Sequence, residues 1–153
     1  MSAAAVGSRT GGCLCGSVRF TADLTTLAFG ACHCEMCRRW TGSALLGITV
    51  PSRNVQWEGD AQIARFQSSD WAERAHCRTC GSALFYHVTA DGPHAENLEM
   101  PIGLFDDANG LTLSNEIYID HKPDSFAYTG DHSRHTRKET LAKFGISEEE
   151  DLA

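Results

Sequence analysis

The stretch Cys32-His33-Cys34-Glu35-Met36-Cys37 places three cysteines within six residues, and two arginines, Arg38 and Arg39, follow directly. Three thiolates this close together can hold one soft metal ion. A tetrahedral ion such as zinc takes four donors, so this stretch leaves one coordination position over. The interpretation of the whole chain depends on what fills that position.

The chain has 153 residues, the length of one ordinary domain, and we expect a single hydrophobic core. Hydrophobic residues make up 42% and charged residues 22%, which is normal for a soluble globular protein. The formal net charge of −7 argues against nucleic-acid binding, because that affinity comes largely from a basic surface. No stretch resembles a membrane span or a secretory signal, so we expect a cytoplasmic location and no membrane partner.

All seven cysteines fall into three groups in which only one or two residues separate neighbours. Such close pairs converge on a metal more readily than they form unstrained disulfides with each other, and a reducing cytosol also disfavours disulfides. Cys77 and Cys80 have the spacing of a zinc knuckle, which supplies two ligands and needs a second pair. Cys13 and Cys15 can supply that pair. We therefore predict a closed four-cysteine site that contributes directly to folding.

The three cysteines of the opening stretch allow three interpretations. A histidine could close a second structural site, and the candidates are His33, His76 and His87. The thiols could instead be free and simply pack in the core. In the third interpretation the metal keeps an open position for water or a substrate sulfur, as catalytic zinc sites do. His33 lies between two of the cysteines and is expected to point away from the metal.

Short stretches with a two-residue alternation or an apolar run follow one another along the chain between turn signals. They predict strands at 18–22, 27–31, 44–50, 55–57, 63–66, 71–75, 83–86, 100–105 and 116–119. Strands this short at this spacing indicate a mainly β fold, an antiparallel sandwich or barrel. A helical turn is expected at 38–41, and the pattern at 133–144 predicts one C-terminal helix before an acidic tail at 148–151.

Four motifs occur in order along the chain: GGCLCGSVRF at 11–20, CHCEMCRRWTGS at 32–43, CRTCGSALFY at 77–86 and EIYIDHKP at 116–123. With them, residues 9–125 resemble the glutathione-dependent formaldehyde-activating enzymes, also called S-(hydroxymethyl)glutathione synthases, which share a domain with centromere protein V. The resemblance implies a fold similar to the β-tent, in which zinc holds short antiparallel strands together. The activity it implies is the reversible addition of glutathione to formaldehyde, a carbon–sulfur lyase reaction when read backwards.

The resemblance divides the cysteines between two zinc ions. It gives a structural zinc to Cys13, Cys15, Cys77 and Cys80, in agreement with the spacing, and a catalytic zinc to Cys32, Cys34 and Cys37. Glutathione would be the co-substrate, because a thiol bound to zinc is deprotonated and becomes a nucleophile. The ion could also polarise the formaldehyde oxygen. The expected partners are therefore a small thiol and an aldehyde, or their adduct.

Four residues near these motifs are candidates for contacts with the substrate. Arg38, Arg39 or Lys122 could hold the glutathione carboxylates, and Tyr118 could pass a proton to the new hydroxyl. Exposed arginine pairs are, however, common on protein surfaces without such a role. His76 stands before the CxxC turn, where relatives usually carry a bulky apolar residue, so it could line the second site or close it.

The chain is expected to divide into a flexible N-terminus at 1–8, the zinc domain at 9–125, and a C-terminal helix with an acidic tail at 126–153. The last part has no counterpart that we identify in the family. It could cap the sheet, restrict the substrate or make a contact in a homodimer. Its charge also leaves an alternative function open, a zinc-stapled protein-binding module of the β-tent fold without catalysis.

Overall fold

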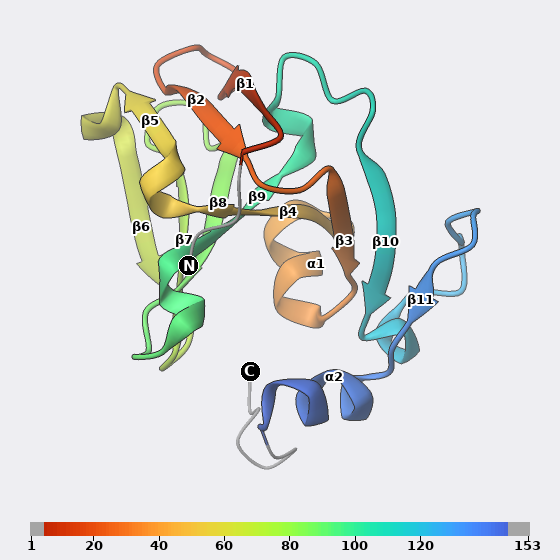
Figure 1. Cartoon of the computed structure of the whole chain (residues 1–153). Helices are drawn as coiled ribbons and strands as arrows, with labels where there is room; N and C mark the ends of the chain where they lie inside the picture. Colours follow the sequence, from red (N-terminus) through yellow and green to blue (C-terminus); the bar gives the residue numbers. More distant parts are fainter. Residues whose placement is uncertain (1–4, 147–153) are drawn as a thin grey trace. The chain divides into compact units, whose positions relative to one another are not determined.

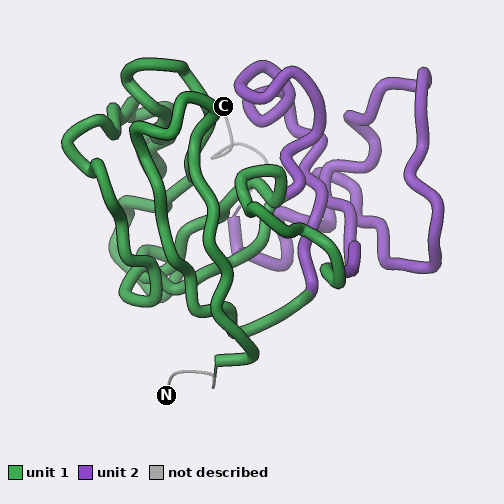
Figure 2. The backbone as a smooth tube through the Cα atoms, turned by 90° about the horizontal axis from the view of Figure 1, so that it is seen from above, with its two compact units in different colours: residues 1–27, 47–111 green, residues 28–46, 112–153 purple. Residues whose placement is uncertain are grey.

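The computed structural model describes residues 5–146, so the acidic tail predicted at 148–151 lies outside the described residues. Strands dominate, and the mainly β fold predicted from the sequence is confirmed (Figure 1). The chain divides into two compact units, one of residues 1–27 and 47–111 and the other of residues 28–46 and 112–153 (Figure 2). Each unit combines distant parts of the sequence. The domain boundaries predicted after residues 8 and 125 stay predictions.

The first unit contains a three-stranded antiparallel sheet with β2 (Arg19–Leu24) between β1 (Gly7–Gly12) and β5 (Val55–Glu58). Every second residue of β2, beginning with Phe20, is buried, which is the alternation that the sequence shows. The Phe20 ring packs edge-on against Phe105, with 5.4 Å between the ring centroids. The predicted strands at 18–22 and 55–57 therefore form one small sheet with a buried face.

Strand β1 is not among the predicted strands, and its first two residues, from Gly7, fall within the segment 1–8 predicted as a flexible N-terminus. No strand is predicted here from the sequence, because the segment is rich in glycine, which is rare inside strands. A Cβ added at Gly11 would lie 2.3 Å from the carbonyl oxygen of Leu104, so only glycine lets the two backbones approach this closely. Beside it, the Arg9 side chain donates a hydrogen bond to the carbonyl oxygen of Asp107 at 2.8 Å. Contacts with Leu104 and Asp107, which lie far along the chain, therefore hold this strand in place.

The other strands of the first unit lie in the order β4-β9-β8-β7-β6, and each neighbouring pair is antiparallel. They are β4 (Leu45–Pro51, of which residues 47–51 belong to this unit), β6 (Ile63–Gln67), β7 (Ala72–Cys77), β8 (Ala83–Val88) and β9 (Asn97–Pro101). Short 3-10 helices connect strands at Ser52–Asn54, Asp60–Gln62, Pro93–Glu96 and Ile102–Leu104. The strand predicted at 100–105 is wrong in position, because the chain turns into a 3-10 helix after Pro101.

In the second unit, β10 (Thr112–Ile117) lies between β3 (Ala28–Cys32) and the short strand β11 (Ser133–Arg134). Both pairings are parallel, which corrects the prediction of antiparallel strands for this part of the chain. Parallel neighbours need a long connection, and between β3 and β10 the chain runs through the first unit. The strand predicted at 116–119 ends earlier, because Tyr118 has a φ of 55° and begins a turn into a 3-10 helix at Ile119–His121.

Helix α1 (Glu35–Thr41) belongs to the second unit and starts earlier than the turn predicted at 38–41. Its N-cap is Cys34, whose Sγ accepts a hydrogen bond from the Cys37 N–H. The usual N-cap residues are Ser, Thr, Asp and Asn, so the sequence gives no clear start signal here. The helix ends at Gly42, whose φ of 84° suits glycine. Two cysteines of the opening stretch are thus built into the first turn of a helix.

Helix α2 (Arg137–Phe144) confirms the single predicted C-terminal helix. It begins after Thr136, whose hydroxyl accepts from the Glu139 N–H while the Glu139 carboxylate accepts from the Thr136 N–H. It is shorter than the predicted range of 133–144, because Ser133 and Arg134 pair with β10 as strand β11. Neither helix of the described residues has the length and hydropathy needed to cross a membrane.

Candidate metal centres

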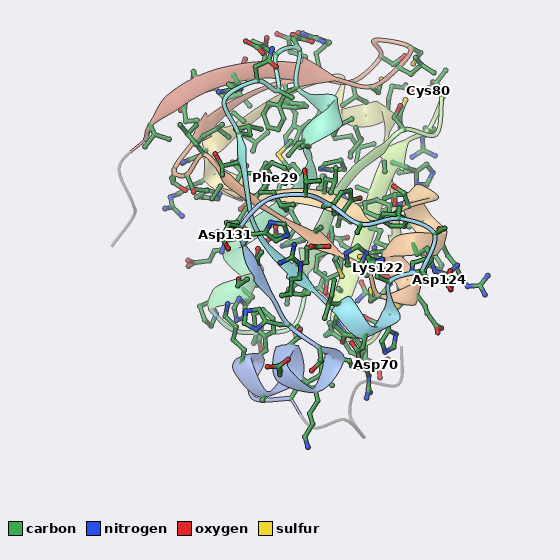
Figure 3. All side chains as sticks on the ribbon, turned by 90° about the vertical axis from the view of Figure 1, so that its right-hand side faces the viewer. Phe29, Asp70, Cys80, Lys122, Asp124 and Asp131 are labelled. Atoms are coloured by element: carbon green, nitrogen blue, oxygen red, sulfur yellow. The ribbon has the colours of Figure 1, made fainter. Side chains whose placement is uncertain are left out.

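Four cysteines of the first unit come together from two turns. Cys13 and Cys15 lie between β1 and β2, while Cys77 ends β7 and Cys80 lies in the turn before β8, where Figure 3 labels it. The four sulfur atoms lie within 4.8 Å of one another. The Sγ of Cys15 is 3.6 Å from that of Cys13 and 3.8 Å from that of Cys77. All four are free thiols, so the group predicted as a closed site is assembled without a disulfide.

The turns around this group, which we call the four-cysteine cluster, place hydroxyl groups beside the sulfur atoms. The Ser17 hydroxyl lies 3.2 Å from the Sγ of Cys15 and lowers the pKa of that thiol. The Ser82 hydroxyl lies 3.3 Å from the Sγ of Cys80 and lowers the pKa of Cys80 to about 5. A lowered pKa favours the thiolate, which is the form that binds a metal. The donor set therefore fits a tetrahedral zinc ion with four sulfur ligands.

The second unit holds the other three cysteines. Cys32 is the last residue of β3, Cys34 caps α1 and Cys37 lies in its first turn. Their sulfur atoms also lie within 4.8 Å of one another, and we call them the three-cysteine cluster. Contacts with Cys34 and Cys37, together with burial, raise the pKa of Cys32 well above its usual value. A metal bound here must displace that proton. Among the described residues of the second unit, no histidine or carboxylate joins these three sulfur atoms as a fourth ligand.

The three histidines predicted as candidates for the fourth ligand have different surroundings. His33 is 2% exposed, and its Nε2 lies 2.6 Å from Glu116 Oε1. In the first unit, His87 contacts the Glu73 carboxylate with Nδ1 and a backbone carbonyl oxygen with Nε2, both at 2.8 Å. Both histidines thus have hydrogen-bonding partners of their own. His76 lies on β7 of the first unit, and its relation to the three-cysteine cluster stays a prediction.

The buried carboxylate of Glu116 contacts His33, which lies between two cysteines of the three-cysteine cluster, and His132 in the C-terminal part of the chain. It is 1% exposed and accepts hydrogen bonds from His33 and His132, both at 2.6 Å, and it lies 3.3 Å from Arg134 Nε. Burial opposes ionisation, but the contacts with His132 and His33 outweigh it and lower the pKa of Glu116. The sequence did not reveal this group. The alternation of residues in the sequence places Glu116 in a strand. No local pattern predicts its contact with His132, which lies 16 residues further along the chain.

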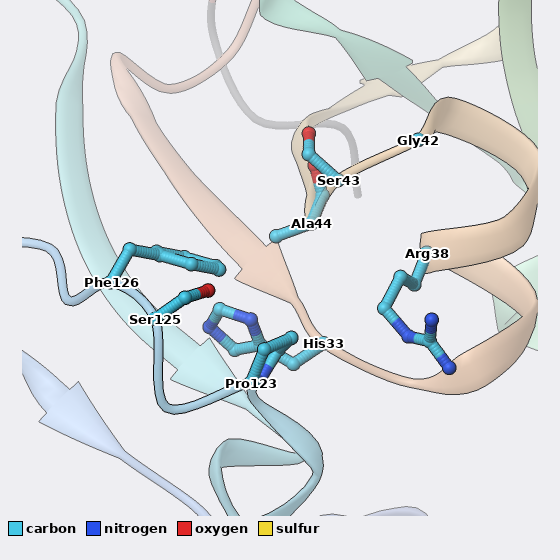
Figure 4. A pocket seen from close by; sticks show the side chains of 8 residues that line it. All are labelled: His33, Arg38, Gly42, Ser43, Ala44, Pro123, Ser125 and Phe126. Atoms are coloured by element: carbon cyan, nitrogen blue, oxygen red, sulfur yellow. The ribbon is translucent and has the colours of Figure 1, made fainter.

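A pocket of about 560 Å³ lies beside His33 in the second unit (Figure 4). It is lined by His33, Arg38, Gly42, Ser43, Ala44, Pro123, Ser125 and Phe126. Of the two arginines predicted to hold carboxylates, Arg38 lines the pocket, whereas Arg39 is exposed and is not part of its lining. The structure therefore distinguishes between two neighbouring arginines that the sequence treats alike.

Lys122 and Tyr118, the other two candidates for substrate contacts, both follow β10. Lys122 Nζ donates to the carbonyl oxygens of Pro123, at 2.7 Å, and of Phe126. It also lies 4.9 Å from the centre of the Phe126 ring, so it holds the loop in which Figure 3 labels Lys122 and Asp124. Tyr118 is the one non-glycine residue with a positive φ in the described part of the chain. The roles of both residues toward glutathione stay predictions.

The family model described as glutathione-dependent formaldehyde-activating enzyme matches residues 8–121. The chain belongs to this family. An uncharacterized lyase of Schizosaccharomyces pombe is 28% identical over 132 residues, which cover 86% of this chain and 93% of the yeast protein. The crystal structure of a Rhodobacter sphaeroides protein matches with a TM-score of 0.55 and 22% identity, over 66% of this chain and 91% of the other. This structural match supports the fold.

Membership of the glutathione-dependent formaldehyde-activating family confirms the resemblance read from the four motifs. In this family member, two groups of cysteines are arranged so that each could hold a metal ion. The family match ends at residue 121. One side of the pocket, at Pro123, Ser125 and Phe126, and the Glu116 partner His132 therefore come from the part of the chain beyond the match.

Proposed function

We propose that this member of the glutathione-dependent formaldehyde-activating family is a zinc-dependent carbon–sulfur lyase. Most concretely, it joins glutathione and formaldehyde to S-(hydroxymethyl)glutathione and splits that adduct again. The observation that carries the proposal is the three-cysteine cluster, which gathers three thiols and no fourth ligand from the described residues of its own unit. Catalytic zinc sites keep one position open in this way. The family description and the name of the yeast relative, a lyase, support the same class of reaction.

The proposed enzyme carries two zinc ions per chain, one in each cysteine cluster. The four-cysteine cluster would hold the structural ion, and Cys32, Cys34 and Cys37 would hold the catalytic one. When bound there, zinc favours the thiolate form of a coordinated thiol and draws electron density from a carbonyl oxygen. The protein's own contribution is to gather the three thiols at the end of β3 and the start of α1, so that little chain has to be ordered when the ion binds.

In the forward reaction the glutathione sulfur attacks the carbonyl carbon of formaldehyde, so that a carbon–sulfur bond forms while the π bond of the carbonyl breaks, and the oxygen that receives its electron pair takes up a proton. The thiol loses one proton and the new hydroxyl gains one, so no further reactant is needed. We assign the transfer of the proton to the hydroxyl to Tyr118. Its φ of 55° costs energy in a residue with a side chain, and such conformations cluster at functional sites.

Arg38 is the residue that we assign to a glutathione carboxylate, because it lines the pocket beside His33 and guanidinium groups bind carboxylates with two parallel hydrogen bonds. Arg39 is exposed on α1, and Lys122 already donates to two carbonyl oxygens. These two residues are therefore the weaker candidates for the same role. A carboxylate bound at Arg38 would lie next to the turn of α1 that carries Cys37.

Exchange NMR at equilibrium can test the proposed reaction, because it measures how fast glutathione and its formaldehyde adduct interconvert even though thiols also add to formaldehyde without a catalyst. The metal-loaded wild-type chain is expected to raise this rate in proportion to its concentration. Cys34→Ser should lose the increase, and Met36→Leu, a change on the same helix that removes no ligand, should keep it. An unchanged rate with the wild-type chain contradicts the proposal and favours a protein-binding module without catalysis.

A further inference from the structure

Residues 122–134, which we call the C-terminal wall, begin directly after the part of the chain that the family model matches. Contacts within the second unit fix both ends of this segment. At its start, Lys122 donates to the carbonyl oxygens of Pro123 and Phe126. At its end, His132 donates to the buried Glu116 at 2.6 Å, and β11 pairs with β10. The wall is therefore part of the folded unit, and its position is set by packing.

The C-terminal wall packs directly against the loop that carries the three-cysteine cluster. The rings of Phe126 and Tyr128 lie 6.1 and 6.0 Å from the His33 ring, and 5.5 Å from each other, between centroids. His33 sits between two cysteines of the cluster in the sequence and is 2% exposed. A segment beyond the family match thus covers a residue at the centre of the cysteine motif.

The same wall forms one side of the pocket of about 560 Å³. Figure 4 shows Ser125 and Phe126 on one side, Arg38 on the other, and His33 between them. The volume falls in the range of roughly 300–1,000 Å³ that is typical of small-molecule sites. Arg38 brings a permanent positive charge, Ser125 brings a hydroxyl donor, and none of the described lining residues is acidic. In a chain with a net charge of −7, such a lining suits a carboxylate.

We propose that Arg38 and the C-terminal wall form a carboxylate subsite, which selects small thiols that carry a carboxylate over thiols that carry none. The inference rests on the proposed function in taking the ligand to be a thiol. Arg38 directly follows Cys37 in the sequence, so a ligand held at Arg38 is anchored to the same helix as the cluster. A thiol without a carboxylate gains nothing from this anchor. The wall would thus set substrate selection in this chain separately from the metal chemistry.

The test measures binding to the full-length, metal-loaded chain by isothermal titration calorimetry with three probes. Glutathione carries a thiol and carboxylates, S-methylglutathione carries the carboxylates without a free thiol, and cysteamine carries a thiol without a carboxylate. Ser125→Asp adds a negative charge to the pocket at an exposed position of the wall. Ala127→Asp is the matched control, since it adds the same charge at an exposed position of the same segment outside the lining.

Ser125→Asp is expected to weaken the binding of glutathione and of S-methylglutathione about tenfold, because it places a carboxylate opposite Arg38. Arg38→Ala should have a similar effect, while Arg53→Ala, which removes an exposed arginine of the first unit, should change binding less than about twofold. Cysteamine should bind equally to all variants. Equal affinities of Ser125→Asp and Ala127→Asp for glutathione would overturn the subsite.

The probes also separate failure of the subsite from failure of the proposed function. If S-methylglutathione binding depends on Arg38 and Ser125 but glutathione leaves the spectrum of the cobalt-substituted chain unchanged, the subsite stands and the proposed function fails. If glutathione changes the cobalt spectrum with the same affinity in wild type, Arg38→Ala and Ser125→Asp, the proposed function stands and the subsite fails.

Discussion

The two cysteine clusters use the same ligand atoms but connect very different lengths of chain. In the four-cysteine cluster, Cys15 and Cys77 lie 62 residues apart in the sequence. The three-cysteine cluster lies within six residues, at the end of β3 and the start of α1. A metal that joins distant segments orders a long stretch of chain, whereas a metal held by one short stretch orders little of it. From this difference in spacing we predict that a metal in the four-cysteine cluster stabilises the fold more than a metal in the three-cysteine cluster does.

The surroundings of the sulfur atoms also differ. In the four-cysteine cluster the Val18 N–H donates to Cys13 Sγ at 3.3 Å, and the Ser82 hydroxyl lowers the pKa of Cys80 to about 5. Backbone hydrogen bonds lower the pKa of Cys77 there, but burial and the neighbouring thiols outweigh them and raise it. In the three-cysteine cluster, neighbouring thiols and burial raise the pKa of Cys32. Three thiolates also neutralise less of the charge of a zinc ion than four do. A zinc ion in the smaller cluster would therefore keep more Lewis acidity, which fits the proposed catalytic role.

Serine substitutions in the two clusters should show the largest difference between them. Cys80→Ser removes one of the four proposed ligands of the structural zinc, and we expect the variant to unfold. The reason is that the binding energy of a structural zinc, about 10–16 kcal/mol in zinc-finger peptides, is also folding energy. Cys34→Ser should lose one zinc ion and the activity but keep its circular dichroism spectrum and nearly the same thermal midpoint. Metal analysis and thermal unfolding check both variants, and the same behaviour in both would break the comparison.

The next largest effect on stability is expected at Glu116, which contacts His33 between two cysteines of the three-cysteine cluster. Glu116→Gln removes the carboxylate charge that His33 and His132 contact, and losing a hydrogen bond to a charged group costs about 1.5–3 kcal/mol. Urea denaturation measures this loss, and the exposed Glu58→Gln serves as the control with little effect. A variant as stable as the wild type would show that the cluster does not depend on this carboxylate.

The stabilisation by Glu116 should also depend on pH. Burial opposes its ionisation, but His132 and His33 lower its pKa in the folded chain. Its contribution is therefore fully present above the unfolded-state pKa of about 4.3 and is lost as the pH falls below that value. The wild type should lose more stability than Glu116→Gln when urea unfolding is compared at pH 7 and in this acidic range.

Neighbouring arginines of α1 should differ by a smaller factor. Arg38 lines the pocket and Arg39 is exposed, so Arg38→Ala should raise the KM for glutathione about tenfold and Arg39→Ala less than about twofold. Steady-state kinetics over a range of glutathione concentrations provide both values. Two equal effects would mean that the charge near the three-cysteine cluster matters and its place in the pocket does not.

The smallest effect on stability is expected at Asp106, on the surface of the first unit and far from the three-cysteine cluster in the sequence. Arg19 and then Thr10 lower the pKa of Asp106 to about 2. The contribution of Asp106 is therefore present above its unfolded-state pKa of about 3.9 and is lost as the pH falls toward 2. Solvent screens this partly exposed pair, so Asp106→Asn should lower the thermal midpoint at pH 7 only slightly. A decrease in the thermal midpoint at pH 7 as large as the decrease in Glu116→Gln would contradict this ranking.

The sequence alone predicts which cysteines form each cluster, because the ligands of one metal recur at short and characteristic spacings. Cys77 and Cys80 need a second pair, and the structure places Cys13 and Cys15 beside them. Strands such as β2 also follow from the sequence, because their alternation reflects one buried face.

Contacts between distant residues could not be predicted in the same way. Strand β1 is rich in glycine, and its partners lie far along the chain. Periodicity shows that β3 and β10 are strands but carries no information on their parallel direction. The pairing of Glu116 with His132 depends on the fold of the C-terminal wall, for which the sequence offers no local signal.

We propose that the three-cysteine cluster holds a metal with one position open to a thiol. The most direct test replaces zinc by cobalt and adds glutathione while the thiolate-to-cobalt charge-transfer absorption is recorded. An open position predicts a saturable rise in this absorption that corresponds to one added thiolate per chain, present in the wild type and absent in Cys34→Ser. A wild-type spectrum that glutathione leaves unchanged, with both clusters loaded, would contradict the claim.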